Sequence, residues 1–269
     1  MKRIGAISGS EMRLGWLLTV AAFFAACSGE PPRQGGEGGQ LTIKTEPRSK
    51  YGNPPFYDVN GHRYHVLDTA KGYVERGVAS WYGPGFHGKR TSSGEPYDMY
   101  AMTAAHTTLP LPTYVKVTNL ENGNTAVLRV NDRGPFEKNR LIDLSLTAAQ
   151  QLGIHKPGTA LVEVRALDPN DSNDSNLAIA AAIPKVTTSS KPVLYLQVGA
   201  FSSRENAERL QKRLDKAALA KTIIVTGQPS SPQAPYRLRL GPLDSVEAAD
   251  GLLEPLAKLG VHDPHVIID

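Results

Sequence analysis

The sequence contains a single cysteine, Cys27, among its 269 residues. One cysteine excludes an intramolecular disulfide bond and a metal cluster held by several thiolates. The chain also lacks the apolar content of a protein that crosses a membrane several times, because only 40% of its residues are hydrophobic and 21% are charged. This composition is that of an ordinary globular protein, and it excludes a fully disordered chain as well.

Basic residues are in only slight excess. The formal net charge is +4, from 30 Lys and Arg against 26 Asp and Glu. Residues 1–26 supply +2 of it, residues 74–168 hold 10 basic and 9 acidic residues, and residues 192–269 hold 9 of each. A nucleic-acid-binding surface needs a clear local excess of positive charge. We therefore expect no nucleic-acid partner.

Motifs for cofactors and for common nucleophiles are also missing. The sequence has no glycine-rich phosphate loop and no Ser-His-Asp elbow. His62 and His65 stand three residues apart, but no further ligand types cluster around them. We therefore expect no metal and no other cofactor.

The N-terminal residues resemble the signal of a bacterial lipoprotein. The apolar run at 14–26 is short for a transmembrane helix and suits a signal peptide over residues 1–26. The sequence Phe-Ala-Ala-Cys at 24–27 resembles a lipobox, with Phe where Leu is usual, so Cys27 is the expected site of lipidation. The residue after Cys27 is Ser28 and not aspartate. This indicates a lipoprotein anchored in the outer membrane and facing the periplasm. The alternative is a buried Cys27 behind an ordinary signal peptide.

Composition divides the rest of the chain into four parts. Residues 27–63 begin with a stretch rich in Gly and Pro that has little to bury, and we expect a flexible tether with a short lead-in. Residues 64–168 are expected to form one domain and residues 192–269 a second. Residues 169–191, rich in Asp, Ser, Asn and Thr, are the expected linker between them.

The first domain has the pattern of many short strands. We expect strands at 64–67, 75–82, 115–118, 125–130, 141–144 and 161–167. Asn122 and Gly123 are typical of the turn between two antiparallel strands. One short helix is expected at 147–152, capped by Thr147 and ended by Gly153. Short strands with few helices predict a small β-barrel.

The second domain alternates strands and helices. Strands are expected at 193–201, 223–225, 236–240 and 265–268. Ser202 and Glu205 have the spacing of a capping box at the start of a helix. A second helical stripe, residues 252–259, contains Pro255, which must kink it or start its last portion. The order βαββαβ predicts a ferredoxin-like α+β domain.

Four motifs occur in order in the first domain. They are Gly-Val-Ala-Ser-Trp-Tyr-Gly at 77–83, Thr-Ser-Ser-Gly-Glu-Pro-Tyr-Asp at 91–98, Ala-Ala-His-Thr-Thr-Leu-Pro at 104–110 and Val-Asn-Asp-Arg-Gly-Pro-Phe at 130–136. Together they resemble the rare lipoprotein A (RlpA) family over about residues 64–168. The resemblance implies a double-psi β-barrel, a fold also found in expansins, barwin-like proteins and some endoglucanases, and it implies a lytic transglycosylase.

Two motifs in the second domain resemble those of a SPOR domain. They are Gln-Val-Gly-Ala-Phe at 197–201 and Arg-Leu-Arg-Leu-Gly-Pro-Leu at 237–243. The resemblance implies binding to peptidoglycan glycan strands that have lost their stem peptides, which accumulate at division septa. Gln197, Phe201 and Arg239 are the candidates for a glycan-binding sheet face. Alternation along the strand puts Gln197 and Phe201 on one face, and a core position for Phe201 is the alternative.

Asp132 is the main candidate for catalysis. Cleavage of a glycosidic bond needs a carboxylic acid that protonates the leaving oxygen. Asp132 follows an expected strand and precedes Arg-Gly-Pro, a turn that would hold its carboxyl at the barrel rim. By resemblance it is the principal catalytic acid of the family. The alternative is that Asp132 caps the turn by accepting from backbone N–H groups.

The same resemblance places Glu95, Asp98 and His106 in the active groove, where they would position the sugar. Taken alone, Glu95 is equally a solvated loop charge, Asp98 a loop brace and His106 a structural histidine. Trp81 and Tyr82 are candidates for stacking on a sugar ring, with core packing as the alternative.

Asp143 lies between apolar neighbours and is expected to brace the barrel. We therefore expect no metal ligand among the candidate site residues, and the acid–base chemistry of the site would rest on carboxylates and a histidine.

The combined expectation is a peptidoglycan lytic transglycosylase anchored in the outer membrane and enriched at the division septum. It would cleave between N-acetylmuramic acid and N-acetylglucosamine and leave 1,6-anhydro ends. Its expected partners are denuded glycan strands, the outer membrane through a lipid anchor, and division-site proteins. Two alternatives remain: a glycan hydrolase with a second carboxylate that activates water, and a non-catalytic division scaffold that binds the wall.

Overall fold

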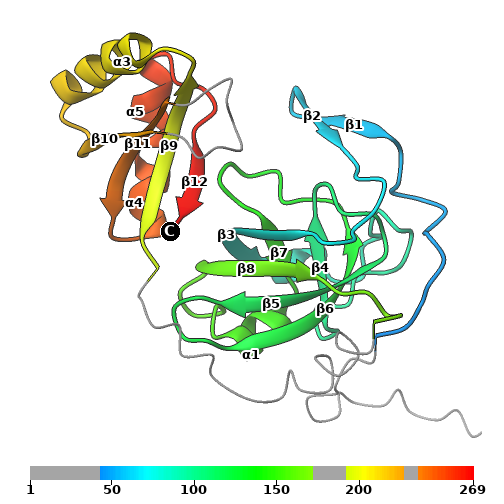
Figure 1. Ribbon diagram of the computed structural model, residues 1–269. Helices are drawn as coiled ribbons and strands as arrows, with labels where there is room; N and C mark the ends of the chain where they lie inside the picture. The colour runs from blue at the N-terminus through cyan, green and yellow to red at the C-terminus, as the bar shows by residue number, and fades with distance from the viewer. Residues whose placement is uncertain (1–42, 172–191, 227–235) are drawn as a thin grey trace, which may run out of the picture. The chain divides into compact units, whose positions relative to one another are not determined.

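The computed structural model describes residues 43–171, 192–226 and 236–269 (Figure 1). The expected signal peptide, Cys27 and most of the expected linker lie outside these residues. Within the described ranges, no helix has the length and apolar character needed to cross a membrane.

Six strands close a barrel in the order β3-β7-β4-β6-β5-β8 (Figure 1). Their bounds are β3 (Val74–Trp81), β4 (Thr103–His106), β5 (Thr113–Asn119), β6 (Thr125–Asp132), β7 (Ile142–Leu144) and β8 (Ala160–Ala166). β3 runs parallel to β7 and β4 parallel to β6, whereas the other neighbours are antiparallel. The predicted small β-barrel is confirmed.

Strand β4 and the helix cap differ from the sequence prediction. The sequence Thr-Ala-Ala-His of β4 has no alternation and no β-branched run, so it gave no strand signal. The helix α1 (Leu146–Leu152) is capped by Ser145, whose Oγ accepts from the N–H of Ala148 at 3.2 Å, and not by Thr147. Gly153 ends the helix as predicted, with a left-handed φ of 75°.

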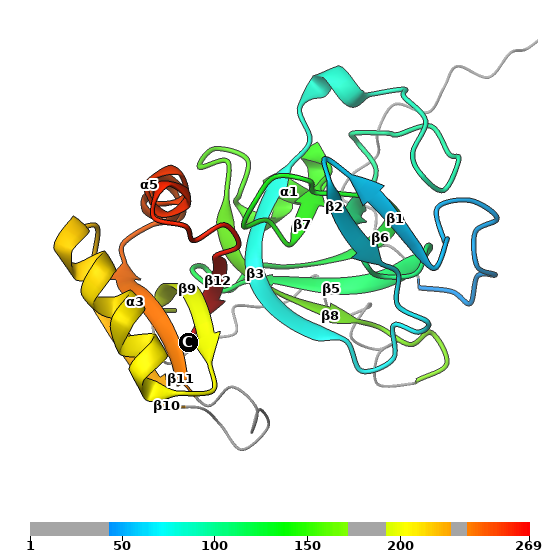
Figure 2. The same cartoon turned by 90° about the horizontal axis from the view of Figure 1, so that it is seen from above.

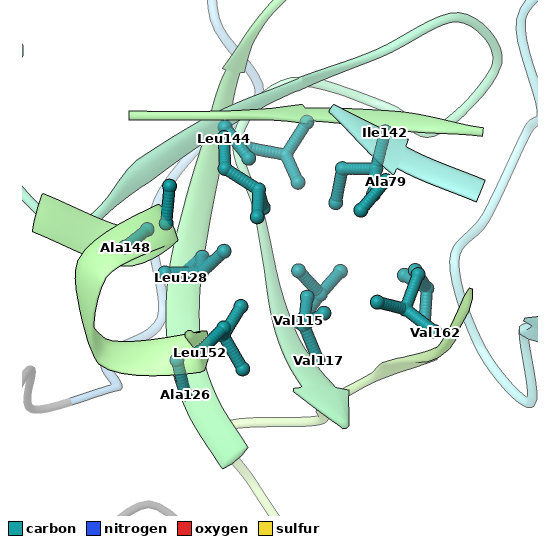
Figure 3. Packing of buried hydrophobic residues seen from close by; sticks show 14 of the residues in the cluster. Ala79, Val115, Val117, Ala126, Leu128, Ile142, Leu144, Ala148, Leu152 and Val162 are labelled. Atoms are coloured by element: carbon teal, nitrogen blue, oxygen red, sulfur yellow. The ribbon is translucent and has the colours of Figure 1, made fainter. Parts of the chain in front are cut away.

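The barrel core is filled by small and branched apolar side chains from all of its walls. Figure 3 shows that Leu128, Ile142 and Leu144 point into the interior together with Ala148 and Leu152 of α1. All five are fully buried. Helix α1 therefore closes part of the barrel with its apolar face, and the short strands are held by this shared core.

A hairpin precedes the barrel and packs beside the loop that follows β6. It consists of β1 (Phe56–Val59) and β2 (His62–His65). The Tyr57 hydroxyl donates to the carbonyl of Thr107 at 2.7 Å, and the Tyr57 and Tyr64 rings both contact Phe136. The chain ahead of the barrel is therefore part of the folded domain.

The C-terminal domain is a four-stranded antiparallel sheet in the order β10-β11-β9-β12. Its elements are β9 (Leu194–Phe201), α3 (Arg204–Ala217), β10 (Thr222–Thr226), β11 (Tyr236–Leu243), α4 (Val246–Gly251), α5 (Leu253–Lys258) and β12 (His265–Ile268). Figure 2 shows α3 lying along the sheet, where Leu214 packs with Leu196 and Leu238. The predicted βαββαβ arrangement is confirmed.

Two details of this domain depart from the sequence pattern. The cap of α3 is Ser203, whose Oγ accepts from the N–H of Asn206, and not Ser202. The second helical region breaks at Leu252, and Pro255 then falls in the first turn of α5, where its missing N–H has no helical partner to lose.

Candidate active site

A β-bulge places Asp132 on the outer face of the barrel. Strand β6 pairs Val130 with Ala104 and then Asp132 with Ala105, so Asn131 is the extra residue. Plain alternation would give Asp132 the same face as the buried Val130. The bulge instead turns the Asp132 side chain to the face of Ala105, because residues paired across strands share a face.

The Asp132 carboxyl is held by three donors. Oδ1 accepts from the backbone N–H of Ser92 and of Arg133, both at 2.7 Å. Among the described residues, Oδ2 accepts from the Tyr82 hydroxyl alone, at 3.4 Å. The geometry therefore supports both interpretations of Asp132. As a turn cap, it accepts from backbone N–H groups through Oδ1, and as a catalytic acid it presents Oδ2, which is loosely held.

Tyr82 is a donor that keeps its proton. Its pKa lies far above the usual range, because partial burial desolvates the hydroxyl and the hydroxyl faces the Asp132 charge. Its ring packs on that of Tyr97, with centroids 4.7 Å apart. The Tyr97 hydroxyl is buried, and among the described residues it has no hydrogen-bond partner.

Glu95 is a fixed anion. It accepts from both terminal nitrogens of Arg129, at 2.8 and 2.9 Å, and from the Asn131 side chain at 3.0 Å. Burial acts to raise the pKa of Glu95, but these donors outweigh it, so the pKa is lowered. A carboxyl of this kind stays charged and suits positioning better than proton donation.

The segment 46–53, which we name the strap, is hydrogen-bonded to strand β6 at Arg129 and to the loop at Ser93. Glu46 accepts from Arg129 at 2.8 and 3.0 Å, which places the guanidinium between Glu46 and Glu95. The Ser49 hydroxyl donates to the carbonyl of Ser93 at 3.1 Å. These contacts could not be predicted from sequence, because the strap lies about 40 residues or more before the motifs that it touches.

Arg133 completes the strap contacts. Its guanidinium donates to the carbonyl of Gly52 at 2.9 Å and to the carbonyls of His106 and Leu109 at 3.0 and 2.6 Å. Burial lowers the pKa of Arg133 to about 10, so it stays charged at neutral pH. This arginine fixes the backbone on which Asp132 sits.

His106 lies inside the fold, 1% exposed. Its Nδ1 accepts from the N–H groups of Thr108 and Leu109, and its Nε2 lies 2.9 Å from the Tyr73 hydroxyl. Burial, with the nearby Arg133 charge, lowers the pKa of His106 to about 3, so the ring is neutral. The imidazole has no hydrogen bond to Asp132, Glu95 or Asp98 in the described structure, and it reaches the site only through its backbone.

In the described structure, neither Asp98 nor Trp81 is hydrogen-bonded to the Asp132 carboxyl. Asp98 is exposed and accepts from the N–H of Tyr100 at 2.9 Å, which is the contact of a loop brace. The Trp81 ring lies against His155, with centroids 4.9 Å apart, and also packs on the barrel core. The structure therefore gathers Asp132, Tyr82 and Glu95 around one rim and leaves these two at its margin.

Sequence reasoning overlooked Asp143 as a site residue. Asp143 pairs with Ala105 across β7 and β4, and Ala105 pairs with Asp132 across β4 and β6. The two carboxylates therefore face the same side, with one small residue between them. The available signal was a charged residue within the apolar run Leu-Ile-Asp-Leu at 141–144.

In the C-terminal domain, Gln197 and Arg239 are cross-strand partners. The Gln197 amide donates to Nε2 of His265 at 3.1 Å, and Arg239 pairs with Asp269 at 2.7 Å. Nε of Arg239 is buried and has no partner among the described residues.

Phe201 packs against the hydrophobic cluster that contains Leu196, Leu214 and Leu238, and it does not share the face of Gln197. The expected alternation fails because a register shift lies between Leu238 and Arg239 of the partner strand. Phe201 lines a pocket of about 800 Å³ together with Arg209 and Arg213 of α3. Within the described ranges, no three His, Cys, Asp or Glu side chains are grouped as metal ligands would be.

Comparison with known proteins gives two family matches. Residues 74–164 match a family described as lytic transglycolase, and residues 190–267 match the SPOR domain. Solved structures that match part of the chain include a Streptomyces papain inhibitor (22% identity, TM-score 0.29, 36% of this chain and 96% of that one) and an expansin of Clavibacter michiganensis (18% identity, TM-score 0.29, 49% and 59%).

Several relatives carry the name endolytic peptidoglycan transglycosylase RlpA. That of Pseudomonas aeruginosa is 35% identical over 258 residues, covering 78% of this chain and 75% of the relative. That of Vibrio cholerae is 39% identical over 216 residues (80% and 76%), and that of Campylobacter jejuni is 42% identical over 172 residues (61% and 62%). Identity and coverage at this level, with both domain matches in order, show that the chain belongs to the RlpA family.

Proposed function

We propose that this protein is an endolytic peptidoglycan lytic transglycosylase in which Asp132 is the acid. The observation that carries the assignment is the unequal treatment of the two Asp132 oxygens. Two backbone N–H groups hold Oδ1 at 2.7 Å, whereas in the described part of the chain Oδ2 has one donor, the Tyr82 hydroxyl, at 3.4 Å. Oδ2 is therefore the oxygen that can carry a proton toward a substrate in a fixed direction.

The reaction needs one proton delivered and one removed. Asp132 gives its proton to the oxygen that links N-acetylmuramic acid to N-acetylglucosamine, and the bond from that oxygen to C1 breaks. The C6 hydroxyl of the muramoyl sugar attacks C1 and loses its proton to a carboxylate of the site. A 1,6-anhydro end forms and no water is consumed.

The other candidate residues support the acid. Glu95 lies in the same loop as Ser92, whose N–H holds Asp132. The hydrogen bonds of Glu95 to Arg129 and Asn131 attach this loop to strand β6. His106 is a positioning residue, because its carbonyl receives the Arg133 guanidinium. Trp81 and Asp98, at the margin of the rim, would contact more distant sugars.

The remaining proposals concern where the enzyme acts. A SPOR domain in the same chain as the barrel supports recruitment to denuded glycan strands, with Gln197 and Arg239 on its binding face. Lipidation of Cys27 would anchor the protein in the outer membrane, facing the periplasm, and denuded glycans would concentrate it at the septum. Division-site proteins are further proposed partners.

The test incubates the purified protein with peptidoglycan strands, with and without prior amidase treatment, and identifies the ends by mass spectrometry. We expect 1,6-anhydro ends, more of them from amidase-treated strands, and their loss in Asp132→Asn. Asp58→Asn is the matched control, because this exposed carboxylate pairs with Arg63 on the hairpin.

Each other result identifies an alternative function. Reducing ends without an anhydro sugar would mean a hydrolase. Strand binding without any cleavage product would mean a wall-binding scaffold in which Asp132 is a turn residue.

A further inference from the structure

Four outward-facing residues form a continuous row across the barrel wall. Ser80 pairs with Asp143, Asp143 with Ala105, and Ala105 with Asp132, over the strand order β3-β7-β4-β6. Adjacent strands lie about 4.8 Å apart, so the two carboxylates stand about two strand spacings from each other. Ala105 has no side chain long enough to separate them.

The Asp143 carboxyl on β7 is bonded to a hydroxyl group and lies near three charged side chains. The Ser80 hydroxyl donates to its Oδ1. The charged and titratable groups that act on it, in addition to this hydroxyl, are Arg140 and Glu137 from the preceding loop and Asp132 from β6. The charges of Asp143 and Asp132 both raise the pKa values of Tyr82 and Tyr97, so the four groups lie in one region.

Burial raises the pKa of Asp143, and the charges of Glu137 and Asp132 raise it further, against the Ser80 hydrogen bond and Arg140. Among the carboxyls of the described residues whose pKa is displaced, Glu46, Asp58, Glu95 and Glu247 move down and Asp143 moves up. A group that holds a proton to higher pH is a stronger base once it is charged.

We propose that Asp143 is a second catalytic carboxyl, the base that takes the proton of the attacking C6 hydroxyl. This inference rests on the proposed function. Asp132 gives its proton to the leaving oxygen, the bond from C1 to that oxygen breaks, and the bond from C1 to O6 forms. The O6 proton goes to Asp143. The pair then returns to its starting state when Asp143 releases its proton to solvent and Asp132 takes one up.

The row makes the two proton transfers cooperate. When Asp132 gives up its proton it becomes negative, and a negative Asp132 increases the affinity of Asp143 for a proton. The base therefore becomes stronger at the moment when the C6 hydroxyl must lose its proton. Bracing of the barrel, the role expected from sequence, would need only the Ser80 bond and no charge.

The experiment measures the rate of 1,6-anhydro product formation against pH in the purified protein and two variants. Asp143→Asn keeps the size of the side chain and an oxygen for Ser80. We expect its kcat to fall about 100-fold with KM changed by less than about threefold. The active pair carries one proton, and the carboxyl that holds a proton to higher pH, Asp143, sets the pH at which the pair loses it. We therefore also expect the alkaline limb of the pH profile to move to lower pH in Asp143→Asn.

Ser80→Ala gives the opposite displacement. Removing a hydrogen bond that favours the charged form raises the pKa of Asp143 further, so the alkaline limb should move to higher pH. If Asp143→Asn does not fold, as judged by its circular dichroism, the Ser80→Ala profile alone decides.

Two results would overturn the inference: unchanged profiles in the folded variants, or a kcat for Asp143→Asn within about threefold of the parent. A parent protein that makes no anhydro ends would instead refute the proposed function itself.

Discussion

Asn53 and Arg133, which stand 80 residues apart, meet at a single oxygen. Oδ1 of Asn53 accepts from the Arg133 guanidinium at 3.2 Å and from the N–H of Leu111 at 2.8 Å, while its amide nitrogen donates to the Leu111 carbonyl at 2.8 Å. The strap is therefore hydrogen-bonded to Arg133, the residue that directly follows Asp132. The folded domain includes residues well ahead of position 64, where the sequence motifs begin.

Removal of the Asn53 side chain should weaken the domain. Asn53→Ala leaves the buried N–H of Leu111 without its acceptor, and a buried donor without a partner costs about 1–3 kcal/mol. We expect the free energy of unfolding, measured in urea, to fall by that amount. Lys71→Ala, on an exposed loop, should change it by less than about 0.5 kcal/mol. Equal stability of Asn53→Ala and the parent would show that the strap contributes nothing.

Stability should fall in acid because of the cluster around Arg129. The pKa values of Glu46 and Glu95 both lie below the ordinary 4.5: burial raises them, but the Arg129 hydrogen bonds outweigh it. A lowered pKa means that the unfolded chain binds the proton first, so the stabilisation is complete above about pH 4.5 and is lost as the pH falls through the folded values. Urea unfolding as a function of pH measures this.

The double variant Glu46→Gln, Glu95→Gln is the test of that cause. It should be less stable than the parent at neutral pH and should lose less stability on acidification. A parallel decline in both proteins would assign the acid sensitivity to other groups.

His106 should remain neutral across the physiological range. Its pKa is lowered to about 3 by burial, against 6.5 in the unfolded chain, so its contribution to stability is present above about pH 6.5 and declines as the pH falls toward 3. Because Nδ1 accepts two N–H groups, the proton must sit on Nε2. Nitrogen NMR of the imidazole should show this tautomer without titration between about pH 5 and 8. An imidazolium signal at about pH 6 would contradict the buried, bonded ring.

Tyr82 and Tyr97, whose rings pack at a tilt of 50°, should respond differently to loss of their hydroxyls. Tyr82→Phe removes the one donor to Oδ2 of Asp132 that the described residues supply, and we expect kcat to fall about tenfold, equivalent to about 1.4 kcal/mol. Tyr97→Phe removes a buried hydroxyl without a partner in the described structure, so the free energy of unfolding should stay equal or rise by up to about 1 kcal/mol. Rate assays and urea unfolding on both variants provide the comparison.

The sequence predicted most elements correctly where pattern and turn chemistry act locally. Alternating strands such as β5, the Asn-Gly turn after it, and the glycine end of α1 depend on neighbours within a few residues. It missed β4, because the sequence Thr-Ala-Ala-His is a strand only through its pairing with β6 and β7.

The candidate site was predicted in its residues more than in its roles. Asp132, Glu95 and Tyr82 do lie around one rim, but Glu95 is a charged partner of Arg129 and His106 is a neutral residue of the interior. Neither state can be inferred from spacing, because burial and the identity of the hydrogen-bond donors decide the pKa.

The sequence by itself determined the composition, the two-domain order and the short-range elements, because hydrophobic period and capping act over a few residues. Tertiary structure decided which carboxylates face each other. One extra residue, Asn131, turns Asp132 from the core face to the outer face, and pairing across β4 then brings it level with Asp143. Strand register depends on contacts between distant segments, and a shift of one residue exchanges the two faces of a strand.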